Sequence, residues 1–82
     1  MRAFYYKLES GNISNPIILK VECNDSQTDF YAFNKALEFA KREELHGNGD
    51  GLGVSITDVT TETEKYLKEH EDQDIEKFFI VI

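Results

Sequence analysis

The spacing of the hydrophobic residues changes along this chain, and that spacing limits the folds it can adopt. Alternation with a period of two, typical of strands with one buried face, occurs in two early segments. Its members are Phe4, Tyr6 and Leu8 in the first segment and Ile17, Leu19, Val21 and Cys23 in the second. Turn-forming residues, including Gly11 and Pro16, separate the two segments. We therefore predict an antiparallel hairpin of two strands over residues 2–23.

A helical spacing, with a period of about 3.6 residues, follows Ser26. Ser26 and Asp29 have the spacing of an N-terminal capping pair. Lys41 and Arg42 stand where positive charge favours a helix C-terminus. The apolar stripe of this segment consists of Phe30, Phe33, Ala36, Leu37 and Ala40. We predict that this stripe faces the core, and that Phe39, on the opposite side, is exposed or extends an interface.

Two more strands are predicted in the second half of the sequence. Leu52, Val54 and Ile56 alternate with small residues, as in a half-buried strand. Residues 78–82 are apolar at every position. Because an uncovered apolar edge strand promotes aggregation, we predict that this run is a central strand buried on both faces.

A second, shorter helix is predicted between these two strands. Thr61 and Glu64 have the spacing of a capping box, which marks a helix N-terminus. The residues that we expect to turn toward the core are Tyr66, Leu67 and His70.

The order of these elements, ββαβαβ, predicts one α+β domain over residues 1–82 with a four-stranded mixed sheet. We expect both helices to pack mainly on one face, and right-handed crossovers to make parallel neighbours among strands two, three and four. The other face would then be open. Its apolar members are Tyr5, Ile18, Phe79 and Val81. They form either a homodimer face or a small apolar patch on a polar surface.

Negative charge is concentrated in residues 58–76, which hold eight acidic residues against two lysines, a balance of −6 out of the chain's −7. Glu62 with Lys65 and Glu64 with Lys68 have spacings that stabilise a helix. Residues 69–76 hold five acidic residues and no lysine or arginine. Negative charge near a helix C-terminus opposes the helix dipole, so stability does not ask for this second half, although a loop after the helix relieves part of the cost. The segment is either a solvated surface or a binding patch.

Glycine recurs at every second position from Gly47 to Gly53. Phosphate-binding glycine loops lead from a strand into a helix, whereas this segment leads from a helix to a strand. A calcium loop would need carboxylates where His46 and Thr57 stand. We predict a glycine cap and turn; the alternative is a mobile rim for a small ligand, beside Cys23 or His46.

Catalytic and metal-binding residue types are sparse. Cys23, His46 and His70 are the only cysteine and histidines, and their spacing is not that of a zinc site. Cys23 has the inward position of a strand, where cysteine is typically a small buried hydrophobe. His70 is expected to be a helix residue at the edge of the core. The sequence therefore predicts no catalytic residue, no metal and no cofactor.

Size and charge favour a binding function. A chain of 82 residues has little core to enclose a deep pocket. Nine scattered Lys and Arg residues disfavour direct binding of nucleic acid. The sequence has no secretory signal or membrane-spanning run, and its single Cys23 suits a reducing compartment, so we expect a cytoplasmic protein.

The functional prediction is a small, non-enzymatic interaction protein whose acidic ridge binds a basic surface of another protein, such as a nucleic-acid-binding protein. The ridge consists of Glu62, Glu69, Glu71, Asp72, Asp74 and Glu76. By analogy of size and charge alone, it compares with nucleic-acid-mimicking inhibitors from phages and mobile elements. The alternatives are a small-ligand-binding or enzymatic domain that uses the Gly47 to Gly53 segment, and a purely structural homodimerising subunit.

Overall fold

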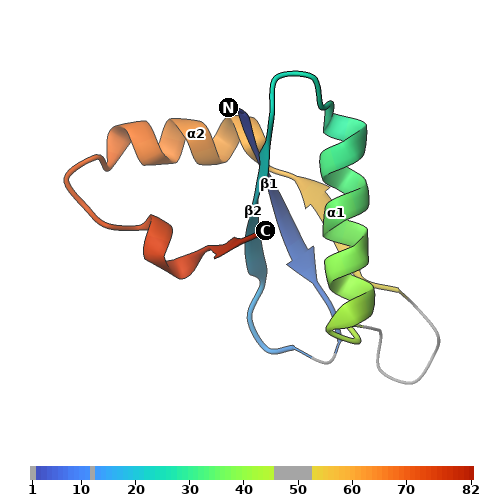
Figure 1. Ribbon diagram of the computed structural model, residues 1–82. Coiled ribbons are helices and arrows are strands. Elements are labelled where there is room, and N and C mark those ends of the chain that lie inside the picture. Colours follow the sequence, from blue (N-terminus) through green and yellow to red (C-terminus); the bar gives the residue numbers. More distant parts are fainter. Residues whose placement is uncertain (1, 12, 46–52) are drawn as a thin grey trace.

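The computed structural model describes residues 2–11, 13–45 and 53–82. In chain order its elements are β1 (Arg2–Glu9), β2 (Ile17–Cys23), α1 (Asp29–Arg42), β3 (Ser55–Asp58), α2 (Thr60–Glu69), the 3-10 turn η1 (Glu76–Phe78) and β4 (Ile80–Val81) (Figure 1). The predicted ββαβαβ order and α+β class are confirmed. Among the described residues, no helix combines the length and apolar character that crossing a bilayer requires.

The four strands form one mixed sheet in the order β3-β1-β2-β4. β1 and β2 make the predicted antiparallel hairpin, in which Tyr6 lies opposite Leu19. β4 runs parallel to β2, as expected, with Ile80 opposite Leu19. β3, however, pairs antiparallel with β1, so it is not a neighbour of β2. The prediction of parallel neighbours is therefore right for β2 and β4 and wrong for β3.

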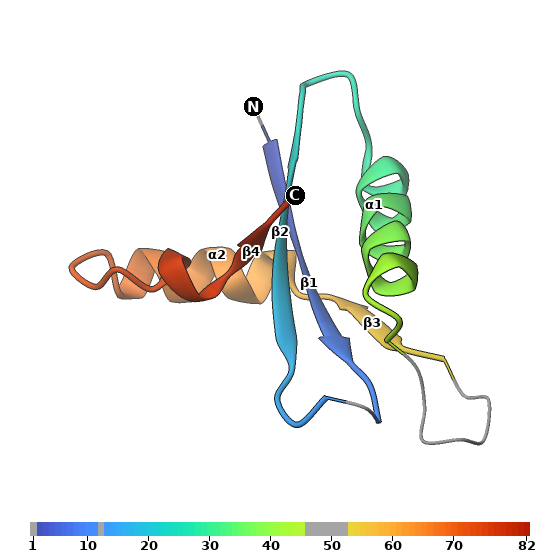
Figure 2. The ribbon, with the colours of Figure 1, turned by 60° about the horizontal axis from the view of Figure 1, so that its bottom comes forward.

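The two helices lie on opposite sides of the sheet (Figures 1 and 2). The connection through α1 leads from β2 past β1 to β3, and the connection through α2 leads back across the sheet to β4. Two crossovers of the usual right hand that traverse a sheet in opposite directions must lie on opposite faces. The expected placement of both helices on one face is corrected accordingly, because it assumed a strand order that the chain does not have.

The core lies between α1 and one face of the β1–β2 hairpin. The sheet contributes Phe4, Tyr6, Leu8, Leu19, Val21 and Cys23, and the helix contributes Ala32, Ala36, Phe39 and Ala40. These four helical residues recur at the spacing of one helix face. Three of them are alanines, so the helix backbone can approach the sheet closely, and the large ring of Phe39 fills the space at the far end.

The aromatic residues of α1 are placed differently from the prediction. Phe39 is only 5% exposed, whereas Phe30 is 73% exposed and Phe33 39%. The predicted stripe is right for Ala36 and Ala40, which are buried, and wrong for Phe30 and for Phe39. Large residues dominate a hydrophobic stripe, whereas close packing against this sheet selects the alanine side of the helix.

The helix starts also differ from those predicted. Ser26 donates its hydroxyl to Oδ1 of Asn24 (2.7 Å) and thus belongs to a turn, and α1 begins after Thr28, which makes no side-chain capping bond. At α2, the backbone N–H of Thr60 donates to Oδ1 of Asp58 (2.9 Å). Thr61 therefore lies inside the helix, and the predicted capping box does not form there.

The run of residues 78–82 is not a central buried strand. β4 has two residues at the edge of the sheet, Ile80 (40% exposed) and Val81 (53% exposed), and Phe78 in η1 is 74% exposed. Two residues of this segment do pack inward: the Phe79 ring meets that of Tyr5 edge-on with 5.7 Å between centroids, and Ile82 packs against the core cluster. Tyr5 is thereby 4% exposed on the face opposite α1. The hydrophobicity of residues 78–82 predicted that they are buried, but the segment after α2 pairs only with the edge of the sheet, beside β2.

We expect opposite effects from truncating two phenylalanines of α1. Phe39→Ala should lower the free energy of unfolding by about 3–5 kcal/mol, because it leaves a cavity in the only described core cluster. Phe30→Ala should change it by no more than about 0.5 kcal/mol, because the ring is mostly solvated. Urea denaturation of both variants measures this difference; equal losses would show that the helix face is assigned wrongly.

Candidate functional site

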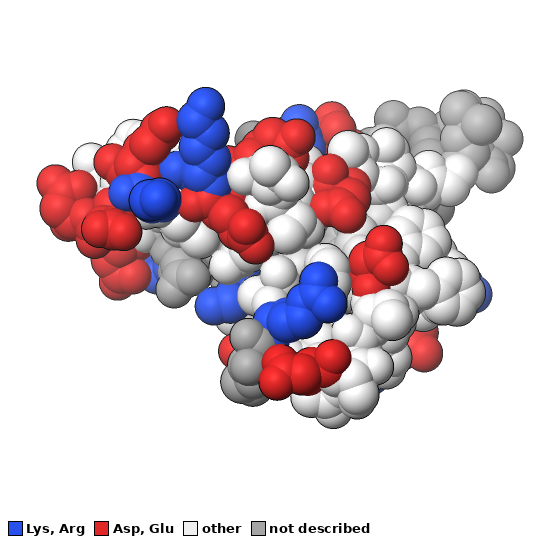
Figure 3. Space-filling model, turned by 90° about the horizontal axis from the view of Figure 1, so that it is seen from above, with Lys and Arg blue, Asp and Glu red and all other residues white. Residues whose placement is uncertain are grey.

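The second half of the acidic segment forms the far end of α2 and the turn that follows it. The backbone N–H of His70 donates to the carbonyls of Tyr66 and Leu67, which closes the helix, and the N–H of Gln73 donates to the carbonyl of His70 (3.0 Å). We call the exposed carboxylates of this segment, Glu69, Glu71, Asp72 and Asp74, the acidic turn. In Figure 3, acidic side chains gather at the left end of the molecule, with some basic side chains among them.

The carboxylates of the acidic turn are not neutralised within the described part of the chain. The ion pairs described there lie elsewhere, for example between Lys35 and Glu38 (4.0 Å). The predicted pairs of Glu62 with Lys65 and Glu64 with Lys68 are also not formed among the described side chains. The partial negative charge at the C-terminus of α2 adds to that of the turn. This end of the molecule therefore carries an excess of negative charge, which Lys68 in the last turn of α2 only partly offsets.

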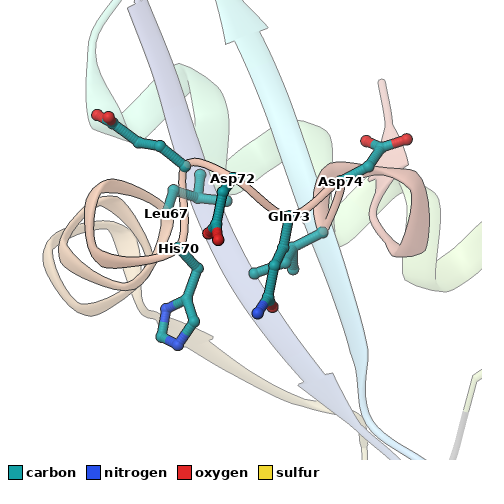
Figure 4. Close-up of a pocket in the computed structure, with 7 residues that line it drawn as sticks. Leu67, His70, Asp72, Gln73 and Asp74 are labelled. Carbon is teal, nitrogen blue, oxygen red and sulfur yellow. The ribbon is translucent and has the colours of Figure 1, made fainter.

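A hollow of about 460 Å³ lies in the bend of this turn (Figure 4). It is lined by Leu67, His70, Glu71, Asp72, Gln73, Asp74 and Ile75. In Figure 4, the side chains of His70, Asp72 and Gln73 extend toward one side, and that of Asp74 extends away from them. Every polar residue of the lining is exposed or half-buried, so the hollow is open to solvent.

His70 is held at the edge of this hollow by two contacts with Tyr66. Its ring stacks on the Tyr66 ring with 4.2 Å between centroids, and Nδ1 lies 2.9 Å from the Tyr66 carbonyl oxygen. A carbonyl oxygen only accepts hydrogen bonds, so this contact is a hydrogen bond in the tautomer that carries its proton on Nδ1. The prediction that Tyr66 turns toward the core is wrong, since this residue is 48% exposed; Leu67 and His70 are half-buried.

The other predicted partner-binding residues are divided. Glu62 is exposed in the first turn of α2, about 10 Å of helix away from Glu69, because an α-helix rises about 1.5 Å per residue. The Glu76 side chain lies outside the described part of the structure. The structure thus places four of the six ridge residues together and Glu62 apart from them.

The predicted dimer face is not one open surface. Tyr5 and Phe79 cover each other within the chain, Ile18 is half-buried, and Val81 is exposed at the edge of β4. A homodimer stays a prediction, and only Val81 of these residues is largely available for it.

Cys23 is buried as predicted, with 2% of its surface exposed, and its thiol lies 4.0 Å from the Val21 carbonyl oxygen. Burial raises the pKa of this thiol, although Arg2 acts in the opposite direction. His46 and the glycine segment lie outside the described residues except for Gly53, so their ligand-binding alternative stays a prediction. Within the described ranges, no three His, Cys, Asp or Glu side chains are grouped to hold a metal ion.

A second hollow, of about 370 Å³, was not predicted from the sequence. We call it the aromatic hollow; it is lined by Tyr6, Asp29, Phe30, Phe33, Ile56 and Asp58. The Tyr6 hydroxyl donates to the backbone carbonyl of Asp29 (3.1 Å), and the Tyr6 and Phe33 rings meet edge-on with 6.2 Å between centroids. Burial, followed by the negative charges of Asp58 and Asp29, raises the pKa of Tyr6 to about 12.

Comparison with protein-family models, with curated proteins and with solved structures found no match for this chain. Any function must therefore be argued from the residues and geometry described above.

The Tyr6 phenol should titrate well above its ordinary pKa of 10.0 in the folded protein. Because the folded-state pKa is raised, its contribution to stability is complete below pH 10 and is lost as the pH rises toward 12. Ultraviolet titration of tyrosinate should show a late transition that is absent in Tyr6→Phe. If Tyr6→Phe instead removes a transition near pH 10, the Tyr6 phenol titrates like an ordinary tyrosine, and its buried position is contradicted.

Proposed function

We propose that this protein is a binding module whose acidic turn engages a basic surface of another protein. The supporting observation is that four exposed carboxylates, unpaired within the described chain, gather at the end of a helix that contains no buried residue. Charge that serves only solubility is usually mixed in sign over the surface. A field of one sign at a protruding tip instead attracts a partner of the opposite sign.

The position of α2 suits this role. The helix projects from the sheet on the side opposite α1, so its tip stands clear of the core (Figures 1 and 2). A helix of ten residues is about 15 Å long, which is long enough to bring the acidic turn into a groove of a partner. Substitutions at the tip should therefore alter binding without altering the packing of α1 on the sheet.

The chemistry of the tip favours a partner that normally binds phosphates. A nucleic-acid-binding surface presents lysine and arginine side chains arranged to neutralise a row of negative charges. Four carboxylates within six residues offer such a surface a comparable set of acceptors. Because arginine binds carboxylates and phosphates with the same planar fork, one basic groove can accept either. We therefore propose that the partner is a nucleic-acid-binding protein and that the acidic turn competes with nucleic acid for it.

Charge reversal of the acidic turn tests this function. In the variant, Glu69, Glu71, Asp72 and Asp74 are all replaced by lysine. A matched control variant has the same change in net charge at four exposed sites outside α2, namely Glu9, Glu22, Glu38 and Glu43. Both variants should stay folded, because each site is on the surface, and the tip variant should be at least as stable as the wild type, since lysine suits a helix C-terminus.

Affinity capture from a lysate at low and high salt, with identification of the captured proteins, is the measurement. The wild type and the control variant should retain the same basic protein at low salt and lose it at high salt, because ionic association is screened. The tip variant should not retain it. Equal capture by the tip variant would overturn the proposal, and so would a partner that is retained equally at both salt concentrations.

A further inference from the structure

We propose that the aromatic hollow binds an organic cation: an alkylammonium or guanidinium group carried on an apolar stem. The hollow combines two features that such a group requires, aromatic rings that face solvent and carboxylates that lack a cation in the described chain. It lies between the start of α1 and the end of β3, and its lining comes from β1, α1 and β3.

The aromatic part of the hollow is available to a ligand. Phe30 and Phe33 lie one helical turn apart on α1 and are 73% and 39% exposed. Tyr6 forms the floor, where its ring is held by Phe33 and by the hydrogen bond to the Asp29 carbonyl. Cations are attracted to the faces of such rings, and an apolar stem gains from covering them. Phe30 contributes little to the core, so its exposure is explained better by contact with a ligand.

The charged part of the hollow consists of Asp29 and Asp58. Each has a local function, since Asp29 lies in the first turn of α1 and Asp58 accepts the Thr60 N–H with Oδ1. Those functions leave the second oxygen of Asp58 without a described partner, and no described Lys or Arg pairs with either carboxylate. Both carboxylates lie close enough to Tyr6 to act on its phenol. A cation in the hollow would therefore be attracted by two charges as well as by the rings.

The size of the hollow limits the ligand. Its volume of about 370 Å³ is at the lower end of the range for ligand pockets, which is about 300–1,000 Å³. A cationic head group with a short stem fits such a volume, as does the side chain of a lysine or arginine from another protein. A free small amine offers the same chemistry, so the two sources must be separated by experiment.

This site is independent of the acidic turn. The aromatic hollow is lined by Phe30 and Phe33 of α1, whereas the acidic turn follows α2. These two helices lie on opposite sides of the sheet (Figure 1). The charge-reversed tip variant should therefore bind an organic cation as the wild type does. Loss of the proposed protein partner and loss of cation binding are thus separate outcomes.

Titration with short peptides, followed by amide chemical shifts, tests the ligand chemistry. The probes are acetyl-Gly-Lys-Gly-amide, the arginine counterpart, the norleucine counterpart, which is uncharged but similar in shape, and butylammonium. The lysine or arginine peptide should bind about tenfold more tightly than the norleucine peptide, with shifts centred on the hollow. Tighter binding of the peptides than of butylammonium would identify a protein side chain as the ligand, and the reverse would identify a free amine. Equal affinity for lysine and norleucine would overturn the proposal.

Three variants locate the binding. Phe30→Ala removes an exposed ring, and Asp58→Asn removes a charge while keeping an oxygen that can cap α2. Each should weaken binding of the tighter peptide about fivefold or more. Phe78→Ala is the matched control, because this ring is similarly exposed (74%) and lies outside the hollow. The affinity of this variant for the peptide should be unchanged. Wild-type affinity in both hollow variants, with folded spectra, would rule out this site.

Discussion

The packing of α1 on one face of the β1–β2 hairpin is the interaction on which the rest of this structure depends. The described core cluster is built from it, with three alanines that allow close approach and Phe39 that fills the end of the interface. A hairpin alone is at best marginally stable in water, so the hairpin needs this helix and the helix needs the hairpin. Once α1 covers that face, the remaining elements are added to an existing core.

The helix α2 contributes no residue to the described core cluster. The helix has no buried residue, although its start is bound to the sheet where the Tyr5 N–H donates to Oγ1 of Thr60 (2.9 Å). On the same face of the sheet, the Phe79 ring packs against Tyr5. Selection for packing therefore acts weakly on α2, and its end can carry charges that the helix dipole does not favour. The two proposed sites can coexist because they lie in different places. The acidic turn lies beyond the core, and the aromatic hollow lies at the edge of the core, between α1 and β3.

The sequence predicted those parts of the fold that depend on local patterns. Alternation at Phe4, Tyr6 and Leu8 located β1, and the helical period located α1, because each reports the geometry of a few neighbouring residues. Periodicity identified the buried side of α1 only in part: Ala36 and Ala40 are buried as predicted, but Phe30 is exposed and Phe39 is buried. Alanines are weak hydrophobic signals, whereas Phe30 is a strong one. Nor could it reveal that β3 pairs with β1, because strand order depends on contacts between distant segments.

The candidate sites, too, could be predicted from the sequence only where they depend on neighbouring residues. The acidic turn was predictable because its residues are contiguous, whereas the aromatic hollow joins Tyr6, the start of α1 and Asp58 from distant parts of the chain. The sequence signal for the hollow was present in Phe30 and Phe33, but their spacing was interpreted as a core stripe. An exposed aromatic pair beside an unpaired carboxylate becomes visible only after the helix has been oriented by its alanines.

A core of α1, β1 and β2 supports α2 and the acidic turn as an arm that has no buried residue of its own. Native-state amide hydrogen exchange tests it most directly, because it measures the opening free energy residue by residue. This arrangement predicts that core amides such as those of Leu19 and Ala36 exchange only through global unfolding, and that the amides of α2 exchange through local opening at much lower free energy. Equal protection of α2 and the hairpin would contradict it.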